Sequence, residues 1–217
     1  MIDEFLGSAN VLASAISGLM EERLLTETTA KTLTLSQLKI LKLLASSGQG
    51  TIGDLAAFLG VSNPAASKAV EKLVRRRLVR RTEDALDRRS SAVTLSEAAR
   101  RMMADYESAR RRRLTRLFRD ISAAELRRTA GLLERLSARI VTQGAHPEEV
   151  CLQCGIHLGQ RCLVREAANI KCSYEQRRSK SKGRTDVSYH DSPAAANEIP
   201  AGSGSTMGPP RQRAARV

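Results

Sequence analysis

The stretch TIGDLAAFLGVSNPAASKAVEKLVRRR, residues 51–77, decides the fold, because it contains two short helical patterns with a glycine between them. Thr51 is a suitable cap for the first helix, and Ser62 or Asn63 is a suitable cap for the second. From Gly60 to the second cap the chain has just enough residues for a tight turn. The stretch therefore predicts two short helices joined by that turn.

The apolar positions divide each of these helices into a buried face and an exposed face. The first helix is expected to bury Ile52, Leu55, Ala56 and Leu59. The second is expected to turn a stripe of aliphatic residues inward: Ala66, Ala69, Val70, Leu73 and Val74. Its outward face carries small, polar and basic residues: Ser62, Asn63, Ala65, Ser67, Lys68, Lys72 and Arg75. Small and basic residues thus share one exposed face.

A β-hairpin with a basic tip is predicted directly after the second helix. The segments LVRRT (residues 78–82) and SAVTL (residues 91–95) are strand-like, and the polar loop EDALDRRS joins them. Two short helices followed by such a hairpin form a winged helix-turn-helix, in which the second helix enters the major groove of DNA. The hairpin lies along the DNA backbone and can place an arginine in the minor groove. Arg88 and Arg89 stand at this tip, beside Asp87.

Basic side chains are in excess over this part of the chain. From Lys68 to Arg89 nine are basic: Lys68, Lys72, Arg75, Arg76, Arg77, Arg80, Arg81, Arg88 and Arg89. Four are acidic: Glu71, Glu83, Asp84 and Asp87. The whole chain of 217 residues carries a net charge of +13, which favours a polyanionic partner such as nucleic acid. Aromatic residues make up 3% of the chain, so few side chains are available to stack on the bases of a single strand. Double-stranded DNA is therefore the better fit.

Helical patterns on both sides complete a mainly α fold with a small β-hairpin wing. Residues 2–24 keep the apolar spacing of one long amphipathic helix. Thr34 begins a capping-box pattern for the next helix, after which SSGQG is expected to be a loop. Ser96 opens a long basic helix, and Ser122 opens another that ends before a glycine.

From about Leu33 to Ile140 the chain resembles the MarR-type transcriptional regulators. The matching pieces are LTLSQLKILKLLA, IGDLAAFLGVSNPAASKAVEKLVRR, LVRRTEDALDRRSSAVTLS and the two helices after them. The Asp-x-Arg of the wing is the most specific of these. The resemblance implies that Asp87 holds Arg89 by an ion pair and that Arg89 reaches the minor groove. Arg77 and Ala99 stand where such proteins often carry glycine, so the sequence departs from the family pattern at both positions.

The resemblance also implies a homodimer, since in this family the N-terminal helix and the last helices of the domain interlock. The apolar faces of residues 2–24 and 126–140 would supply that contact. The implied function is a sequence-specific regulator, with repression as the expected sign of control, that reads a pseudo-palindromic operator with one recognition helix per half-site. The residues identify no effector. A non-specific architectural DNA-binding protein is the alternative that the basic C-terminal tail favours.

Four cysteines are confined to one C-terminal segment with the spacing C-x2-C-x7-C-x9-C: Cys151, Cys154, Cys162 and Cys172. C-x2-C followed by Gly155 resembles a metal knuckle, because one tight turn then points both sulfurs at one ion. Four thiolates suit tetrahedral Zn2+, which is slightly favoured, and on ligand count they suit an iron-sulfur cluster equally well. His157 is an alternative ligand, and a redox pair of Cys151 and Cys154 is a further option. Such a centre predicts a response to metal or redox state.

Composition divides the chain into a winged-helix and dimerisation domain (residues 1–145), a four-cysteine segment (146–175) and a flexible basic tail (176–217). The apolar run at residues 9–20 is short and interrupted by polar side chains, so it is expected to be neither a signal peptide nor a membrane span. The sequence therefore predicts a cytoplasmic protein. An enzyme is not expected, because a thiol or metal oxidoreductase would need acid-base or phosphate-binding motifs that do not accompany the thiols.

Overall fold

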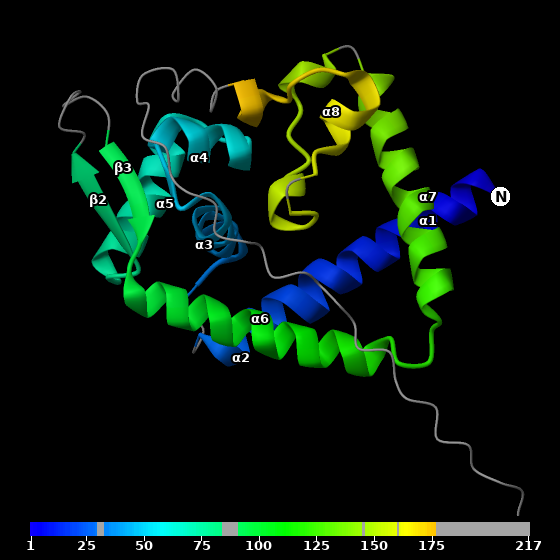
Figure 1. The fold of residues 1–217 in the computed structure, drawn as a ribbon, viewed down its shortest axis with the longest axis horizontal. Coiled ribbons are helices and arrows are strands. Elements are labelled where there is room, and N and C mark those ends of the chain that lie inside the picture. Colours follow the sequence, from blue (N-terminus) through cyan, green and yellow to red (C-terminus); the bar gives the residue numbers. More distant parts are fainter. Residues whose placement is uncertain (30–32, 84–90, 145, 160, 177–217) are drawn as a thin grey trace, which may run out of the picture. The chain divides into compact units, whose positions relative to one another are not determined.

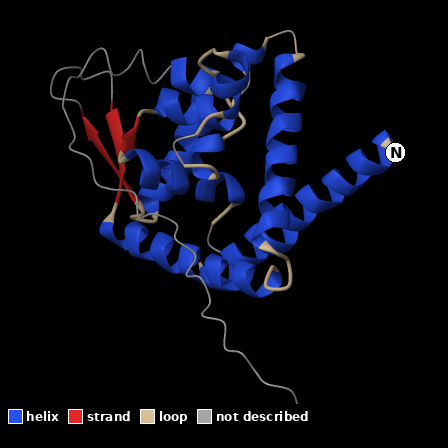
Figure 2. Ribbon diagram, turned by 45° about the vertical axis from the view of Figure 1, so that its right-hand side comes forward, coloured by secondary structure: helices blue, strands red, loops and turns tan. Residues whose placement is uncertain are grey.

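The computed structural model describes residues 1–29, 33–83, 91–144, 146–159 and 161–176. Helices dominate, and a small antiparallel sheet accompanies them (Figure 2). At the N-terminus the segments α1 (Ile2–Ser14), η1 (Ala15–Glu22) and α2 (Arg23–Thr28) follow one another without a break, with η1 in π-helical geometry. The long N-terminal helix predicted over residues 2–24 is therefore present and continues to Thr28.

The central elements are those of a winged helix-turn-helix: α3 (Leu35–Ser47), β1 (Gln49–Gly50), α4 (Ile52–Leu59), α5 (Asn63–Arg75), β2 (Val79–Glu83) and β3 (Ser91–Leu95). Residues 35–95, in their described part, are called the reading head below. From the hairpin, α6 (Glu97–Leu117) leads to α7 (Ala123–Thr142) (Figure 1). The short helices η2 (Pro147–Glu149), η3 (Cys154–Ile156) and α8 (Leu163–Ala168) follow. The mainly α fold with a small hairpin wing is confirmed.

Side-chain caps start the helices at the residues that the sequence indicated. Complete capping boxes are present at Thr34, Thr51 and Ser122. At the start of α6 the backbone N–H of Ala99 donates to the Ser96 hydroxyl over 3.1 Å. Ser62, and not Asn63, caps α5, because the backbone N–H of Ala65 donates to its hydroxyl. The local signals for helix starts were sufficient because each needs a single side chain and a neighbouring backbone group.

The sheet has the strand order β1-β3-β2, and both pairings are antiparallel. Val79 pairs with Leu95 at the base of the hairpin, as the predicted strands require. Gln49 pairs with Thr94, so the segment SSGQG, expected as a loop, contributes the two-residue strand β1. β1 pairs with the free edge of β3, which lies more than forty positions later in the chain. A strand of two residues is too short to show the alternation of polar and apolar residues that predicts a strand.

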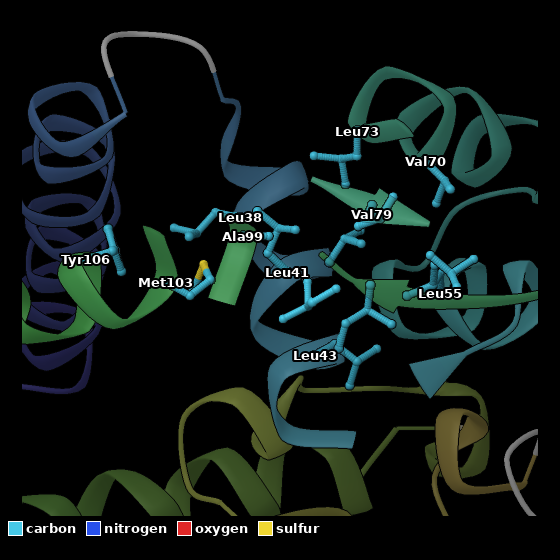
Figure 3. Packing of buried hydrophobic residues seen from close by; sticks show 14 of the residues in the cluster. Leu38, Leu41, Leu43, Leu55, Val70, Leu73, Val79, Ala99, Met103 and Tyr106 are labelled. Atoms are coloured by element: carbon cyan, nitrogen blue, oxygen red, sulfur yellow. The ribbon is translucent and has the colours of Figure 1, made fainter. Parts of the chain in front are cut away.

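The core lies between α3, α4, α5, α6 and the hairpin (Figure 3). Leu41 of α3, Leu55 of α4 and Leu73 of α5 are completely buried. Met103 and Tyr106 extend this core along α6. Burial of these apolar side chains fixes how the two helices of the helix-turn-helix meet, because interiors pack at close to crystalline density.

Two details of the predicted buried faces are corrected. Phe58 of α4 is completely buried, whereas Ile52 and Leu59 are only partly buried. Val74 of α5 is 37% exposed, because the inward stripe is narrower than predicted and runs through Ala66, Val70 and Leu73. Phe58 faces a segment far along the chain, which helical periodicity within α4 does not reveal.

A buried ion pair joins the N-terminal helix to α3. The Lys42 ammonium lies 3.2 Å from the Glu21 carboxylate, and the two side chains are 7% and 12% exposed. The ammonium also lies 5.2 Å from the centre of the Tyr106 ring and 3.8 Å from the carboxylate of Glu107. Burial, with the nearby carboxylate of Glu21, raises the pKa of Tyr106 well above its ordinary value.

The N-terminal helix presents an uncovered apolar surface. None of the residues of α1 is buried, and seven large apolar side chains of α1 and η1 are exposed: Ile2, Phe5, Leu6, Val11, Leu12, Ile16 and Leu19. On α7 the apolar side chains Leu126, Leu132 and Ile140 are exposed as well. Contiguous apolar surface of this kind marks an interaction site in soluble proteins. Among the described residues, no helix combines the length and the apolar character that crossing a bilayer needs.

Candidate nucleic-acid interface and cysteine module

The turn between α4 and α5 contains three residues, Gly60, Val61 and Ser62. Gly60 adopts a left-handed conformation with φ of +66°, which is unfavourable for residues that have a Cβ. This geometry ends α4, and the Ser62 cap begins α5 immediately afterwards. The helix-turn-helix predicted from residues 51–77 is therefore present, and its second helix is thirteen residues long.

The outward face of α5 is placed as predicted. Six of the seven proposed contact residues are exposed: Ser62, Asn63, Ala65, Lys68, Lys72 and Arg75. Ser67 is partly buried, because its hydroxyl accepts a hydrogen bond of 3.0 Å from the Arg81 guanidinium and donates to Glu71 over 3.4 Å. Arg81 belongs to β2, so this bond fastens the wing to the recognition helix. The sequence offered no signal for it, since the two residues lie on different elements.

The turn between α5 and β2 carries backbone strain at an informative position. Arg77 has a φ of +57°, a left-handed conformation that costs a residue with a Cβ about 1 kcal/mol or more. The sequence places Arg77 where related proteins often have glycine, and the backbone keeps the conformation that glycine would favour. Its neighbour Arg76 donates to the side-chain oxygen of Gln37 over 3.3 Å, which ties the end of α5 to α3.

The tip of the wing, with Asp87, Arg88 and Arg89, lies outside the described residues. The ion pair between Asp87 and Arg89 and the minor-groove contact of the tip stay predictions. The described strands on either side set where the hairpin starts, and the exposed side chains of Arg80 and Arg81 on β2 continue the basic surface of α5.

A recognition helix with an exposed basic face, fastened to a two-stranded wing, defines a winged helix-turn-helix DNA-binding protein. The model of the MarR family matches residues 31–90. A solved transcriptional regulator of the MarR family from Silicibacter pomeroyi is 30% identical over 62% of this chain and 90% of its own, with a TM-score of 0.50. A MarR family protein from Bacillus stearothermophilus is 21% identical over 64% of this chain and 98% of its own, with a TM-score of 0.54.

The chain belongs to the MarR family, and it is a DNA-binding transcriptional regulator. No curated protein sequence matches it. The two solved structures are covered over 90% and 98% of their own lengths, yet each leaves more than a third of this chain unmatched. This chain is therefore considerably longer than the regulators that it resembles.

The four cysteines are brought together by the fold of residues 146–159 and 161–176, called the cysteine module below. Cys154, Cys162 and Cys172 are buried, Cys151 is partly buried, and all four are free thiols. The sulfurs of Cys162 and Cys172 lie within 4.8 Å of each other. Cys151 packs against the hydrophobic cluster that contains both of these residues. Three cysteines, up to 21 positions apart in the sequence, are thus gathered in one cluster.

Neighbouring backbone groups lower the pKa of each thiol and so oppose the effect of burial. Gln153 has this effect on Cys151 and Leu163 on Cys154. Arg165 has it on Cys162 and Glu175 on Cys172. Such backbone groups favour the thiolate form.

Burial raises the pKa of Cys154 and of Cys162, whereas the hydrogen bond between Cys151 and Cys172 lowers the pKa of Cys151 and raises that of Cys172. Three of the four thiols therefore hold their protons at neutral pH when no cation is bound, and a bound cation would displace those protons.

Two neighbouring residues are assigned differently from the sequence-based expectation. A carboxylate oxygen of Glu175 and the sulfurs of Cys162 and Cys172 lie within 4.8 Å of one another, although the sequence analysis did not consider this glutamate. It also forms an ion pair of 3.3 Å with Arg165. Burial lowers the pKa of His157, considered as an alternative ligand. Its ring is not part of the group that Cys162, Cys172 and Glu175 form in the described part of the chain.

Proposed function

We propose that the chain is a homodimeric repressor that reads a pseudo-palindromic operator in double-stranded DNA. The observation that carries this proposal is the outward face of α5, where basic and small polar side chains are exposed together and fastened to the wing by the bond from Arg81 to Ser67. The first residues of a recognition helix contact base edges in this fold, and later ones contact phosphates. Asn63 is therefore assigned to base reading, and Lys72 and Arg75 to the backbone.

The partner in the dimer is a second copy of this chain. Exposed apolar side chains on α1, η1 and α7 form the surface that a second copy would cover, and a symmetric dimer buries the same surface on both subunits. Two reading heads related by a two-fold axis match the two halves of a pseudo-palindrome. Repression needs no further surface, since an occupied operator that overlaps a promoter blocks transcription.

The experiment selects duplexes from a random DNA pool with the full-length protein and then measures affinity for the selected site at several salt concentrations. Lys72→Ala is expected to weaken binding to all duplexes and to reduce the slope of log K against log salt by about one phosphate equivalent. Asn63→Ala is expected to cost about tenfold on the selected site and to relax the preference at one base pair.

Arg119→Ala is the matched control, because it removes the same charge beyond the far end of α6, and α6 is about 30 Å long. It is expected to bind as the original protein does. A protein that selects no sequence and is competed equally by unrelated DNA would be an architectural binder, and the proposal would be wrong. The sign of control is tested with a reporter gene behind the selected site, whose expression must fall when the protein is supplied.

A further inference from the structure

Three of the four cysteines, Cys151, Cys162 and Cys172, lie at the junction of two hydrophobic clusters. One is the core of the reading head, against which Cys151, Ile156 and Tyr174 pack. The other contains Cys162, Cys172 and Val164, together with Val141 of α7. Cys151 and Tyr174 border both clusters. These thiols therefore occupy the place where the cysteine module meets both the reading head and α7.

On the side of the reading head, two specific contacts reach α4. The side-chain amide of Gln153 donates to the backbone carbonyl of Phe58 over 3.1 Å. The rings of Phe58 and Tyr174 meet edge to face, with centroids 5.4 Å apart. Phe58 is next to the end of α4, two residues before the glycine of the helix-turn-helix turn. The cysteine module thus holds the element that sets the position of α5.

On the side of α7, Arg161 makes paired hydrogen bonds with Glu134, at 3.2 and 2.9 Å. The same guanidinium holds Glu166 of α8 at 2.9 Å. Val164 of α8 is completely buried beside Val141 of α7. Figure 1 shows α8 beside the C-terminal part of α7. The module therefore spans from α4 to a helix that carries part of the apolar surface assigned to the dimer.

The spacing of two sulfurs favours one metal ion over a [4Fe–4S] cluster. In a tetrahedral site with metal–sulfur bonds of about 2.3 Å, the ligand sulfurs are about 3.8 Å apart. The sulfurs of Cys162 and Cys172 lie within 4.8 Å of each other, and Cys151 packs against the same cluster. The four thiolates of a [4Fe–4S] cluster each bind a separate iron atom and stand farther apart. Soft thiolate donors select ions such as Zn2+ over Mg2+ or Ca2+.

We propose that the four cysteines bind a single thiophilic metal ion of the Zn2+ class, which closes the cysteine module into a clasp between α4 and α7. The ion takes the place of the thiol protons and fixes the segments around Cys151, Cys162 and Cys172 to one another. Through Gln153 and Tyr174 it fixes the reading head relative to the dimer surface. This inference rests on the proposed function, because a fixed distance between two reading heads matters only to a dimer on its operator. The closed clasp is the state that binds DNA, since binding then costs less conformational entropy.

The first measurement is the metal content of the full-length protein reconstituted with Zn2+ under reducing conditions, by native mass spectrometry and elemental analysis. One zinc ion per chain is expected. Cys162→Ser combined with Cys172→Ser should lose it, whereas His157→Gln, the matched control, should keep it. Failure to bind zinc would overturn the proposal. Iron with acid-labile sulfide in protein purified without oxygen would overturn the assignment of a single ion.

The second measurement tests the clasp in unaltered protein, by removing zinc with a chelator and then restoring it. Loss of the ion is expected to weaken binding to the selected duplex by about tenfold or more, and restored zinc should recover the affinity. Equal affinity with and without the ion would overturn the clasp. Thermal unfolding, followed in parallel, should shift to lower temperature on zinc removal, because the ion binds the folded chain.

A variant that keeps the ion but lacks the link to α4 separates the clasp from general stabilisation. Gln153→Asn is too short to reach the Phe58 carbonyl but tolerates the left-handed backbone at this position, where φ is +57°. The variant that combines Gln153→Asn with Tyr174→Leu should still bind one zinc ion. Its affinity for the operator should no longer depend on whether zinc is bound. Affinity that still follows zinc would contradict the route through α4. If the original protein selects no operator at all, the proposed function fails, while zinc content and the unfolding shift still test the metal site.

Discussion

Replacing Lys42 by methionine removes the cation from a buried ion pair while keeping nearly the same side-chain length. Glu21, whose side chain is 12% exposed, would keep its carboxylate without the ammonium that lies 3.2 Å away. Breaking a buried pair on one side costs about 3–5 kcal/mol, because the remaining charge stays away from water. Glu21 retains slight contact with solvent, so we expect a loss near the lower end, about 3 kcal/mol.

The reverse substitution should cost less, and this asymmetry follows from the structure. In Glu21→Gln the Lys42 ammonium still has the Glu107 carboxylate at 3.8 Å and the Tyr106 ring at 5.2 Å. An exposed carboxylate and a cation–π contact each contribute about 1 kcal/mol or less, so a loss of about 1–2 kcal/mol is expected. Glu21→Met combined with Lys42→Met replaces both charges by apolar groups and should recover most of the stability.

Urea unfolding of the four proteins, followed by circular dichroism at one protein concentration, measures these differences. The fixed concentration is needed because the stability of the proposed dimer would depend on it. Lys42→Ala is a less suitable variant, since it would add a cavity to the loss of charge. If Lys42→Met loses less than about 1 kcal/mol, or if the double variant is no more stable than Lys42→Met alone, the reasoning about a buried unpaired charge is refuted.

Three further predictions concern single residues. Arg77→Gly should stabilise the chain by about 0.5–1 kcal/mol in urea unfolding, because it relieves the left-handed conformation at φ of +57°, and unchanged stability would mean that the strain is absent. Ser96→Ala should cost about 1 kcal/mol, because it removes the cap of α6. Ser96→Thr, the control, keeps a hydroxyl and should retain most of that stability, and equal losses in the two variants would contradict the prediction. Burial lowers the pKa of His157, so its stabilising effect is present above the unfolded pKa of about 6.5 and is lost as the pH falls below it. His157→Gln should therefore lose less stability than the original protein between about pH 7.5 and about pH 5, and equal losses would show that this histidine is not the group responsible.

Much of the reading head could be predicted because its signals are local. Helix starts at Thr34, Thr51, Ser96 and Ser122 each depend on a side chain within reach of its own helix's first N–H groups. The strands of the hairpin and the outward face of α5 follow from alternation and helical periodicity. The buried position of Phe58 and the strand β1 were missed, because each depends on a partner far along the chain.

The candidate sites divide in the same way. The sequence predicted the exposed basic residues of α5, but the bond from Arg81 to Ser67 required the packing of β2 on that helix. Spacing alone grouped the four cysteines, and the tertiary structure gathered Cys151, Cys162 and Cys172 in one cluster and placed Glu175 beside two of them.

By itself the sequence determined the class of fold, the exposed basic face of α5 and the set of thiols, because capping, periodicity and ligand type are properties of neighbouring residues. The tertiary structure alone decided that the cysteine module packs against both α4 and α7, through Gln153 and Arg161. Contacts between residues 95 positions apart, such as Gln153 and Phe58, depend on the packing of the whole core and leave no period or spacing in the chain.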